Sequence, residues 1–133
     1  MSIFKDQADF MTAGGQTTKA GNSDQIVLYA GLIEEEFIEF IQADAEIDEP
    51  DFVSPESIKE AVDVIVVAAG YLISAVGVDG AQAAWNLVYE SNLSKVSSNI
   101  EKRADGKILK SDEYKHVRKA KLMADLSRLM GSG

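Results

Sequence analysis

Two pairs of acidic residues, each at helical spacing, are the feature of this sequence with the clearest chemical meaning. Glu36 and Glu39 are three residues apart, and Glu60 and Asp63 repeat this spacing further along the chain. Residues three apart on a helix share a face, so each pair would present its two carboxylates together. Apolar residues flank both pairs, and an unpaired charge in such surroundings is costly. Carboxylates from two helices would form an all-oxygen site that suits a hard divalent cation, above all Mg²⁺.

A solvated acidic face is the alternative to a metal site, and it is the usual interpretation of one such pair alone. The second pair weakens this alternative because it leads directly into residues 64–78, which carry no charge. Other metal sites fit less well. The chain has no cysteine, its single histidine, His116, lies far from both pairs, and no segment has the oxygen-rich loop of an EF-hand. The pattern therefore favours Mg²⁺, with Mn²⁺ as a substitute.

A group of cations further along the chain suggests a complementary role. Lys95, Arg103, Lys107 and Lys110 lie close together in sequence, in a chain whose formal charge is −9. Such cations could bind the phosphates of a ligand that also binds Mg²⁺. The alternative is a solvated basic turn around Asp105-Gly106. Acids for a metal together with bases for phosphates point toward phosphoryl chemistry.

Helical patterns in the surrounding sequence would position these residues. Apolar periodicity predicts helices at about residues 3–11, 23–43, 55–76, 79–96 and 112–130. Asn22 can cap the second helix, with Gln25 three residues later in a capping-box pattern, and Ser54-Pro55 is a strong start for the third. Residues 97–110 form a turn-rich basic segment, and no segment has the pattern of a strand. We expect an all-α fold, a bundle of four or five helices.

Length and charge narrow the classes of function. A chain of 133 residues is long enough for one domain with a real core, and we assign residues 1–133 to a single domain. The excess of acids disfavours binding to nucleic acid or to anionic membranes, which require clustered Lys and Arg. No signal peptide is visible, and the uncharged run is shorter than the roughly 20 residues of a membrane span. We expect a cytoplasmic protein and interpret this run as a core helix.

Four motifs follow one another between Glu36 and Lys110, within a resemblance that covers about residues 10–114. They are Glu36-x-x-Glu39, Glu60-x-x-Asp63, Asn92-x-x-Lys95, and Arg103-x-Asp105-Gly106-Lys107-x-x-Lys110. In this order they resemble the all-α nucleoside triphosphate pyrophosphohydrolases, the MazG-like proteins, which include phosphoribosyl-ATP pyrophosphatases and dimeric dUTPases. The chain departs from the family after the last motif, where the family often has prolines around an aromatic residue and this sequence has none.

The resemblance implies a MazG-like bundle that hydrolyses a (deoxy)nucleoside triphosphate to the monophosphate and pyrophosphate with Mg²⁺. The expected substrate is dUTP, dCTP or a non-canonical nucleotide, and the expected role is house-cleaning of the nucleotide pool. The implied metal ligands are Glu36, Glu39, Glu60 and Asp63, and Glu35 would be the catalytic residue that orients or deprotonates water. The implied substrate-binding residues are Asn92, Lys95, Arg103, Lys107, Lys110 and Tyr114.

The resemblance also implies a homodimer or a higher homo-oligomer. The third helix agrees with this, because it is apolar over more of its surface than one small bundle usually covers. Two alternatives remain open at this point. One is hydrolysis of phosphoribosyl-ATP, and the other is a non-catalytic helical module whose acidic face binds a basic partner or a cation.

Overall fold

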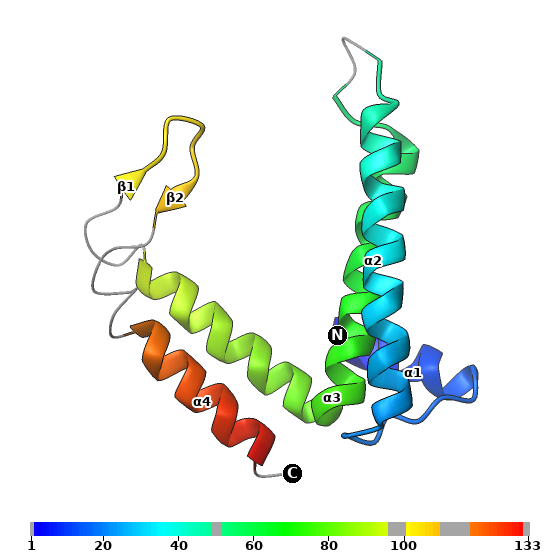
Figure 1. Cartoon of the computed structure of the whole chain (residues 1–133), viewed down its shortest axis with the longest axis vertical. Helices are drawn as coiled ribbons and strands as arrows, with labels where there is room; N and C mark the ends of the chain where they lie inside the picture. The colour runs from blue at the N-terminus through cyan, green and yellow to red at the C-terminus, as the bar shows by residue number, and fades with distance from the viewer. Residues whose placement is uncertain (1, 49–51, 96–100, 110–117, 132–133) are drawn as a thin grey trace. The chain divides into compact units, whose positions relative to one another are not determined.

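The computed structural model describes residues 2–48, 52–95, 101–109 and 118–131, and these are mostly helical (Figure 1). Along the described chain the elements are α1 (Ile3–Ala13), α2 (Ser23–Ala45), α3 (Pro55–Lys95), β1 (Glu101–Lys102), β2 (Ile108–Leu109) and α4 (Lys119–Gly131). The predicted all-α class is confirmed. The chain divides into two compact units, Met1–Ala81 and Gln82–Gly133.

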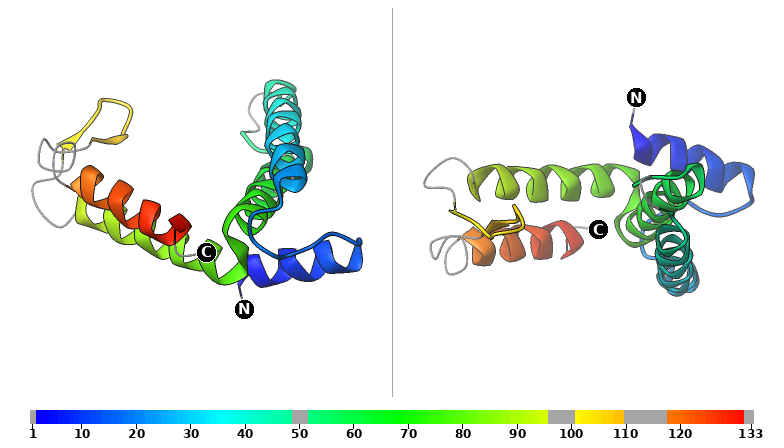
Figure 2. Two further views of the ribbon diagram at one scale, coloured as in Figure 1. Left: turned by 60° about the horizontal axis from the view of Figure 1, so that its bottom comes forward. Right: turned by 90° about the horizontal axis from the view of Figure 1, so that it is seen from above.

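The first unit is a helical hairpin with a third helix packed against it. α2 and the first part of α3 run side by side, and α1 lies across one end of this pair (Figure 2). All three helices contribute to the core, which includes Phe4, Met11, Tyr29 and Ile73. The closest packing joins α2 to α3 at Gly70, where a methyl group would overlap the ring of Tyr29. Only glycine lets the two helices approach this closely at that point.

The start of α2 shows one correct and one wrong prediction. Asn22 caps the helix, because its Oδ1 accepts the N–H of Gln25 at 3.0 Å. The Gln25 side chain does not complete a capping box. Its Nε2 donates to the carbonyl of Thr17 at 2.9 Å and to Ser74 Oγ at 3.2 Å, and its Oε1 accepts the Thr17 N–H at 2.9 Å. Gln25 thus ties the loop before α2 to α3, where the Ser74 carbonyl also accepts the N–H of Gly21 at 2.9 Å.

The predicted start of α3 is confirmed in detail. Ser54 Oγ accepts the N–H of Ser57 and Ser57 Oγ accepts the N–H of Ser54, both at 3.0 Å. The sequence predicted an end at Gly77, and the structure interrupts its helical geometry at that residue, with φ +79° and ψ 174°. A positive φ is readily adopted only by glycine. The two helices expected around Gly77 form one element with a kink between its two parts.

The second unit pairs α4 with the latter part of α3 and adds a short hairpin. Leu122 of α4 is buried. In the hairpin, Glu101 pairs with Leu109 and Lys102 with Ile108 in antiparallel register. The sequence did not predict these strands, because two residues are too few for an alternating pattern. The predicted turn is confirmed at Gly106, which has φ +93° and donates its N–H to the carbonyl of Arg103 at 2.8 Å.

The apolar α3 helix is only partly covered in the single chain. The helix over Pro55–Ser94 is long and apolar enough, by length and composition alone, to cross a membrane. An 18-residue window within it has a mean hydropathy of 2.2, and 28% of that window is buried. Core helices of other proteins pass the same test. Ala69 and Ile73 are buried as expected of a core helix, whereas Val62 and Ile65 are each 52% exposed. Helical spacing puts these four residues on one face of α3, which is therefore covered at Ala69 and Ile73 and accessible one to two turns earlier, at Val62 and Ile65.

Candidate metal centre

Three of the predicted acidic residues meet between α2 and α3. Glu36 comes from α2, and Glu60 and Asp63 come from consecutive turns of α3. Each offers one carboxylate oxygen, and these oxygens all lie within 4.8 Å of one another. All three side chains are half-buried. Of the other predicted acids, Glu35 and Glu39 are exposed on α2 and lie outside this group of three, which we call the acid cluster.

The acid cluster is short of hydrogen-bond donors. Among the described residues, Glu36 Oε2 and Glu60 Oε2 are buried atoms without a hydrogen-bond partner. The pKa of Glu36 is raised to about 7, first by burial and then by a hydrogen bond with Glu39 and the negative charges of Glu39, Asp63 and Glu60. A buried, unsatisfied carboxylate oxygen costs free energy that a proton or a cation can relieve.

Lys59 supplies part of the missing positive charge from the solvent side. Its Nζ lies 2.8 Å from Asp63 Oδ2 and 3.4 Å from Glu60 Oε1. These two carboxylates hold the pKa of Lys59 above its ordinary range. Sequence reasoning missed this residue, although its spacing of four from Asp63 is the usual signal of a helical ion pair. Lys59 is mostly exposed, so it neutralises the outer side of the acid cluster only.

The donor set of the acid cluster fits Mg²⁺ or Mn²⁺. It contains only oxygen atoms, which hard divalent cations prefer, and Glu36 and Glu60 each carry a buried oxygen that has no hydrogen-bond partner in the part of the chain that the structure describes. Mg²⁺ commonly takes a few carboxylates from the protein and completes its coordination with water and substrate phosphates. Glu36, Glu60 and Asp63 are the residues that would hold such an ion.

A groove in the first unit begins at the acid cluster. It lies between α1 and α3 and has a volume of about 690 Å³. Ile3 and Phe10 line it from α1 and Val62 and Ile65 from α3, and all four side chains are substantially exposed. Asp63 lines the groove as well as belonging to the acid cluster. The volume is in the range of about 300–1,000 Å³ that is typical of small-molecule sites.

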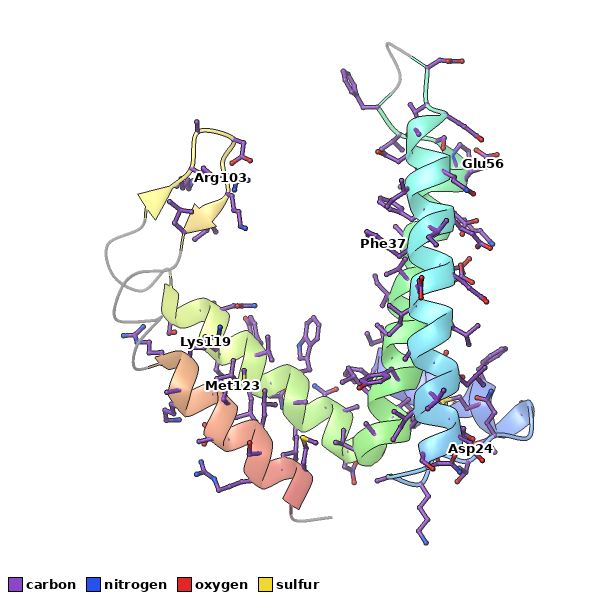
Figure 3. All side chains as sticks on the ribbon, in the orientation of Figure 1. Asp24, Phe37, Glu56, Arg103, Lys119 and Met123 are labelled. Atoms are coloured by element: carbon purple, nitrogen blue, oxygen red, sulfur yellow. The ribbon has the colours of Figure 1, made fainter. Side chains whose placement is uncertain are left out.

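The predicted phosphate-binding residues belong to the second unit or lie outside the described residues. Asn92 is exposed on α3, and Lys95 is the last residue of that helix. Arg103 and Lys107 are exposed in the β1–β2 hairpin, where Figure 3 labels Arg103. Two further predicted residues, Lys110 and Tyr114, fall outside the described residues.

Asp105 has a structural role that the sequence only hinted at. It holds the Arg103 guanidinium through Oδ1 to Nε at 3.0 Å and Oδ2 to NH2 at 2.6 Å. This pair raises the pKa of Arg103 and lowers that of Asp105. Asp105 Oδ1 also accepts the backbone N–H of Lys107 at 3.2 Å. Within the hairpin, Arg103 is therefore already engaged by a carboxylate, and a phosphate would have to compete for it.

No family model, curated protein or solved structure matches this chain. The resemblance of its motifs to the MazG-like proteins therefore stays a prediction. A fold class such as all-α is compatible with many functions, so the function has to be argued from the acid cluster and its surroundings.

Proposed function

We propose that this protein is a Mg²⁺-dependent nucleoside triphosphate pyrophosphohydrolase, which converts a (deoxy)nucleoside triphosphate to the monophosphate and pyrophosphate. The observation that supports it most is the acid cluster, in which Glu36, Glu60 and Asp63 bring oxygens within 4.8 Å of one another. Two buried oxygens of this cluster have no partner among the described residues, as expected for atoms that bind a cation. The motif order in the sequence adds independent support.

Each acidic residue has a part in the proposed reaction. Bound Mg²⁺ would neutralise charge on the phosphates and lower the pKa of a coordinated water. Glu36, Glu60 and Asp63 hold the ion. Glu39 interacts with Glu36 and helps to set the protonation state of the Glu36 carboxyl group. Glu35 is the proposed residue that orients or deprotonates the attacking water. Attack of this water on a phosphorus atom breaks one anhydride bond and releases pyrophosphate.

Cations would hold the triphosphate during the reaction. Lys59 already lies beside two of the three acids. A divalent ion at the acid cluster would compete for the same carboxylates and free the ammonium group to contact a phosphate. The predicted contributions of Asn92, Lys95, Arg103, Lys107, Lys110 and Tyr114 remain part of the proposal. The proposed substrates are dUTP, dCTP or a non-canonical nucleotide.

We further propose that the protein is a homodimer or a higher homo-oligomer. α2 carries an exposed apolar stripe formed by Val27, Phe37, Ile38 and Ile41, with Val27 73% exposed. Helical spacing puts this stripe on the face of α2 away from Glu36. Exposed apolar patches on one side of a helix mark surfaces that a partner covers, and a second copy is the commonest partner. Light scattering on the purified protein tests this, and Ile38→Glu is expected to weaken association.

Pyrophosphate release tests the proposed activity. The wild-type protein would be assayed with a panel of canonical and modified NTPs and dNTPs and with phosphoribosyl-ATP, with Mg²⁺, with Mn²⁺ and with EDTA. We expect metal-dependent release, and a loss of several orders of magnitude in Asp63→Asn and Glu60→Gln while circular dichroism shows intact helices. Glu46→Gln is the matched control, because Glu46 is exposed at the C-terminal cap of α2, outside both the acid cluster and the apolar stripe.

The outcomes separate the proposed enzyme from its alternatives. A strong preference for phosphoribosyl-ATP would identify the biosynthetic reaction instead of pool house-cleaning. Absence of release from every nucleotide, by a folded protein that binds the metal, would support the non-catalytic module and refute the enzyme.

A further inference from the structure

The groove between α1 and α3 is continuous with the acid cluster, because Asp63 lines both. A triphosphate held at the cluster must place the rest of its nucleotide in a neighbouring space. The groove shares Asp63 with the cluster, and its volume of about 690 Å³ is ample for a base and a sugar. The groove is therefore the part of the first unit best placed to receive the nucleoside.

The walls of the groove suit a flat, partly apolar ligand. Ile3, Val62 and Ile65 are each about half exposed, and the ring of Phe10 is 66% exposed. These side chains gather in one concave surface, where a bound base would cover them. An exposed aromatic ring next to a base gains stacking energy with any base, because every base has a π-face.

Three of the residues that line the groove are polar: Asp6, Gln7 and Asp63. Gln7 is buried and its Nε2 donates to Tyr29 Oη at 3.4 Å, so Asp6 is the polar side chain of the α1 wall that a ligand would meet. Asp6 lines the groove from α1, is exposed, and its carboxylate makes no hydrogen bond or ion pair with the described residues. An apolar surface of another macromolecule would bury the Asp6 carboxylate against groups that cannot pair with it, which is costly. A nucleotide avoids this cost, since metal and phosphate chemistry engages Asp63 and a base can donate N–H groups to Asp6.

We propose that this groove is the nucleoside subsite and that Asp6 selects bases with an exocyclic amino group. The inference rests on the proposed function. An ionised carboxylate only accepts hydrogen bonds, so it pairs with the amino group of cytosine, adenine or guanine. A carbonyl oxygen in the same position, as in uracil, would face it with lone pairs and be rejected. Among the expected substrates this favours dCTP over dUTP.

The test compares nucleotides that differ at an amino group. The substrates are dCTP against dUTP and dGTP against dITP, and the ratio of kcat/KM is measured for each pair with Mg²⁺. We expect at least one pair to differ by about tenfold or more in the wild type, as sites that hydrogen-bond a substrate discriminate strongly. Asp6→Asn should bring that ratio close to one. Asp9→Asn, exposed on the same helix and not lining the groove, should leave it unchanged.

Asp6 also lies in the first turn of α1, where an acid stabilises the helix dipole. If Asp6 acted only through the stability of α1, its replacement would change kcat/KM for all substrates equally and would leave the ratio of kcat/KM within each pair unchanged. Binding of the products gives a readout independent of turnover. Calorimetry with Mg²⁺ should show dCMP binding more tightly than dUMP to the wild type, and equally to Asp6→Asn. Phe10→Ala should raise KM for every substrate with little change in kcat.

The failures of the inference and of the proposed function look different. Mg²⁺-dependent hydrolysis with equal ratios in wild type and Asp6→Asn would overturn the inference and leave the enzyme standing. Loss of oligomers in Phe10→Ala with an unchanged KM would show that a second copy covers the groove, and this too overturns it. No hydrolysis of any nucleotide would refute the proposed function and the inference with it.

Discussion

Replacing Glu36 by glutamine should stabilise the metal-free protein at high pH and abolish its stabilisation by Mg²⁺. Glu36 has a pKa of about 7 in the folded protein against 4.5 as the ordinary value, with burial as the main cause. The folded state thus holds this proton more tightly than the unfolded state. Its contribution to stability is fully present below pH 4.5, is lost as the pH rises to about 7, and is absent above that pH.

The magnitude follows from the shift in pKa. At about 1.4 kcal/mol per unit, the shift corresponds to about 3 kcal/mol at most. Glu36 is only half-buried, and solvent screens its interactions with the other acids, so we expect about 1–2 kcal/mol. Glutamine carries no charge at any pH and can donate from its amide to a neighbouring carboxylate. The free energy of unfolding of Glu36→Gln should therefore be about 1–2 kcal/mol higher than that of the wild type at pH 8 and little different at pH 5.

Urea unfolding at pH 5 and pH 8, each with EDTA and with Mg²⁺, measures these differences. Ligand binding to the folded state should raise the stability of the wild type at pH 8 in Mg²⁺ and should not raise that of Glu36→Gln. Glu46→Gln, exposed at the C-terminal cap of α2, serves as the control and should follow the wild type throughout. A variant that is less stable than the wild type at pH 8 in EDTA, or that Mg²⁺ stabilises as much, would refute this account of the acid cluster.

Three further substitutions test other features of the first unit. Lys59→Met should raise the affinity for Mg²⁺ in the absence of nucleotide by about three- to tenfold, because the ammonium no longer competes for the carboxylates. Calorimetry measures this affinity, and equal values for variant and wild type would contradict the prediction. Gly70→Ala should cost about 1–3 kcal/mol in urea unfolding, since its methyl group overlaps Tyr29, and a neutral effect would mean that the ring can move aside. Gly77→Ala should cost about 1–2 kcal/mol because φ is +79°, whereas Gly31→Ala, with open space around it and no positive φ, should be neutral or stabilising.

The sequence alone was sufficient for features that depend on neighbours in the chain. Asn22 and Ser54 cap their helices as predicted, since a cap needs only a side-chain oxygen and backbone N–H groups within three residues. The kink at Gly77 and the turn at Gly106 follow from the freedom of glycine to take a positive φ. Helical spacing also predicted which acids share a face on each helix.

The contacts between distant residues could not be predicted in this way. Gln25 reaches Ser74 instead of Asn22, because packing of α2 against α3 offers its amide more partners than the cap does. The fit of Gly70 to Tyr29 likewise exists only once the two helices are docked.

Local patterns in the chain were enough to predict that it is helical, where most of its helices begin, and which two helices carry the acidic pairs. The packing of α2 against α3 decides which of these acids meet, namely Glu36, Glu60 and Asp63, and the packing of α1 against α3 forms the groove beside Asp63. The two kinds of feature differ in how far apart along the chain the interacting residues lie. Helix propensity, capping and turn formation act over a few residues, whereas the distance between two carboxylates on different helices depends on how both helices pack.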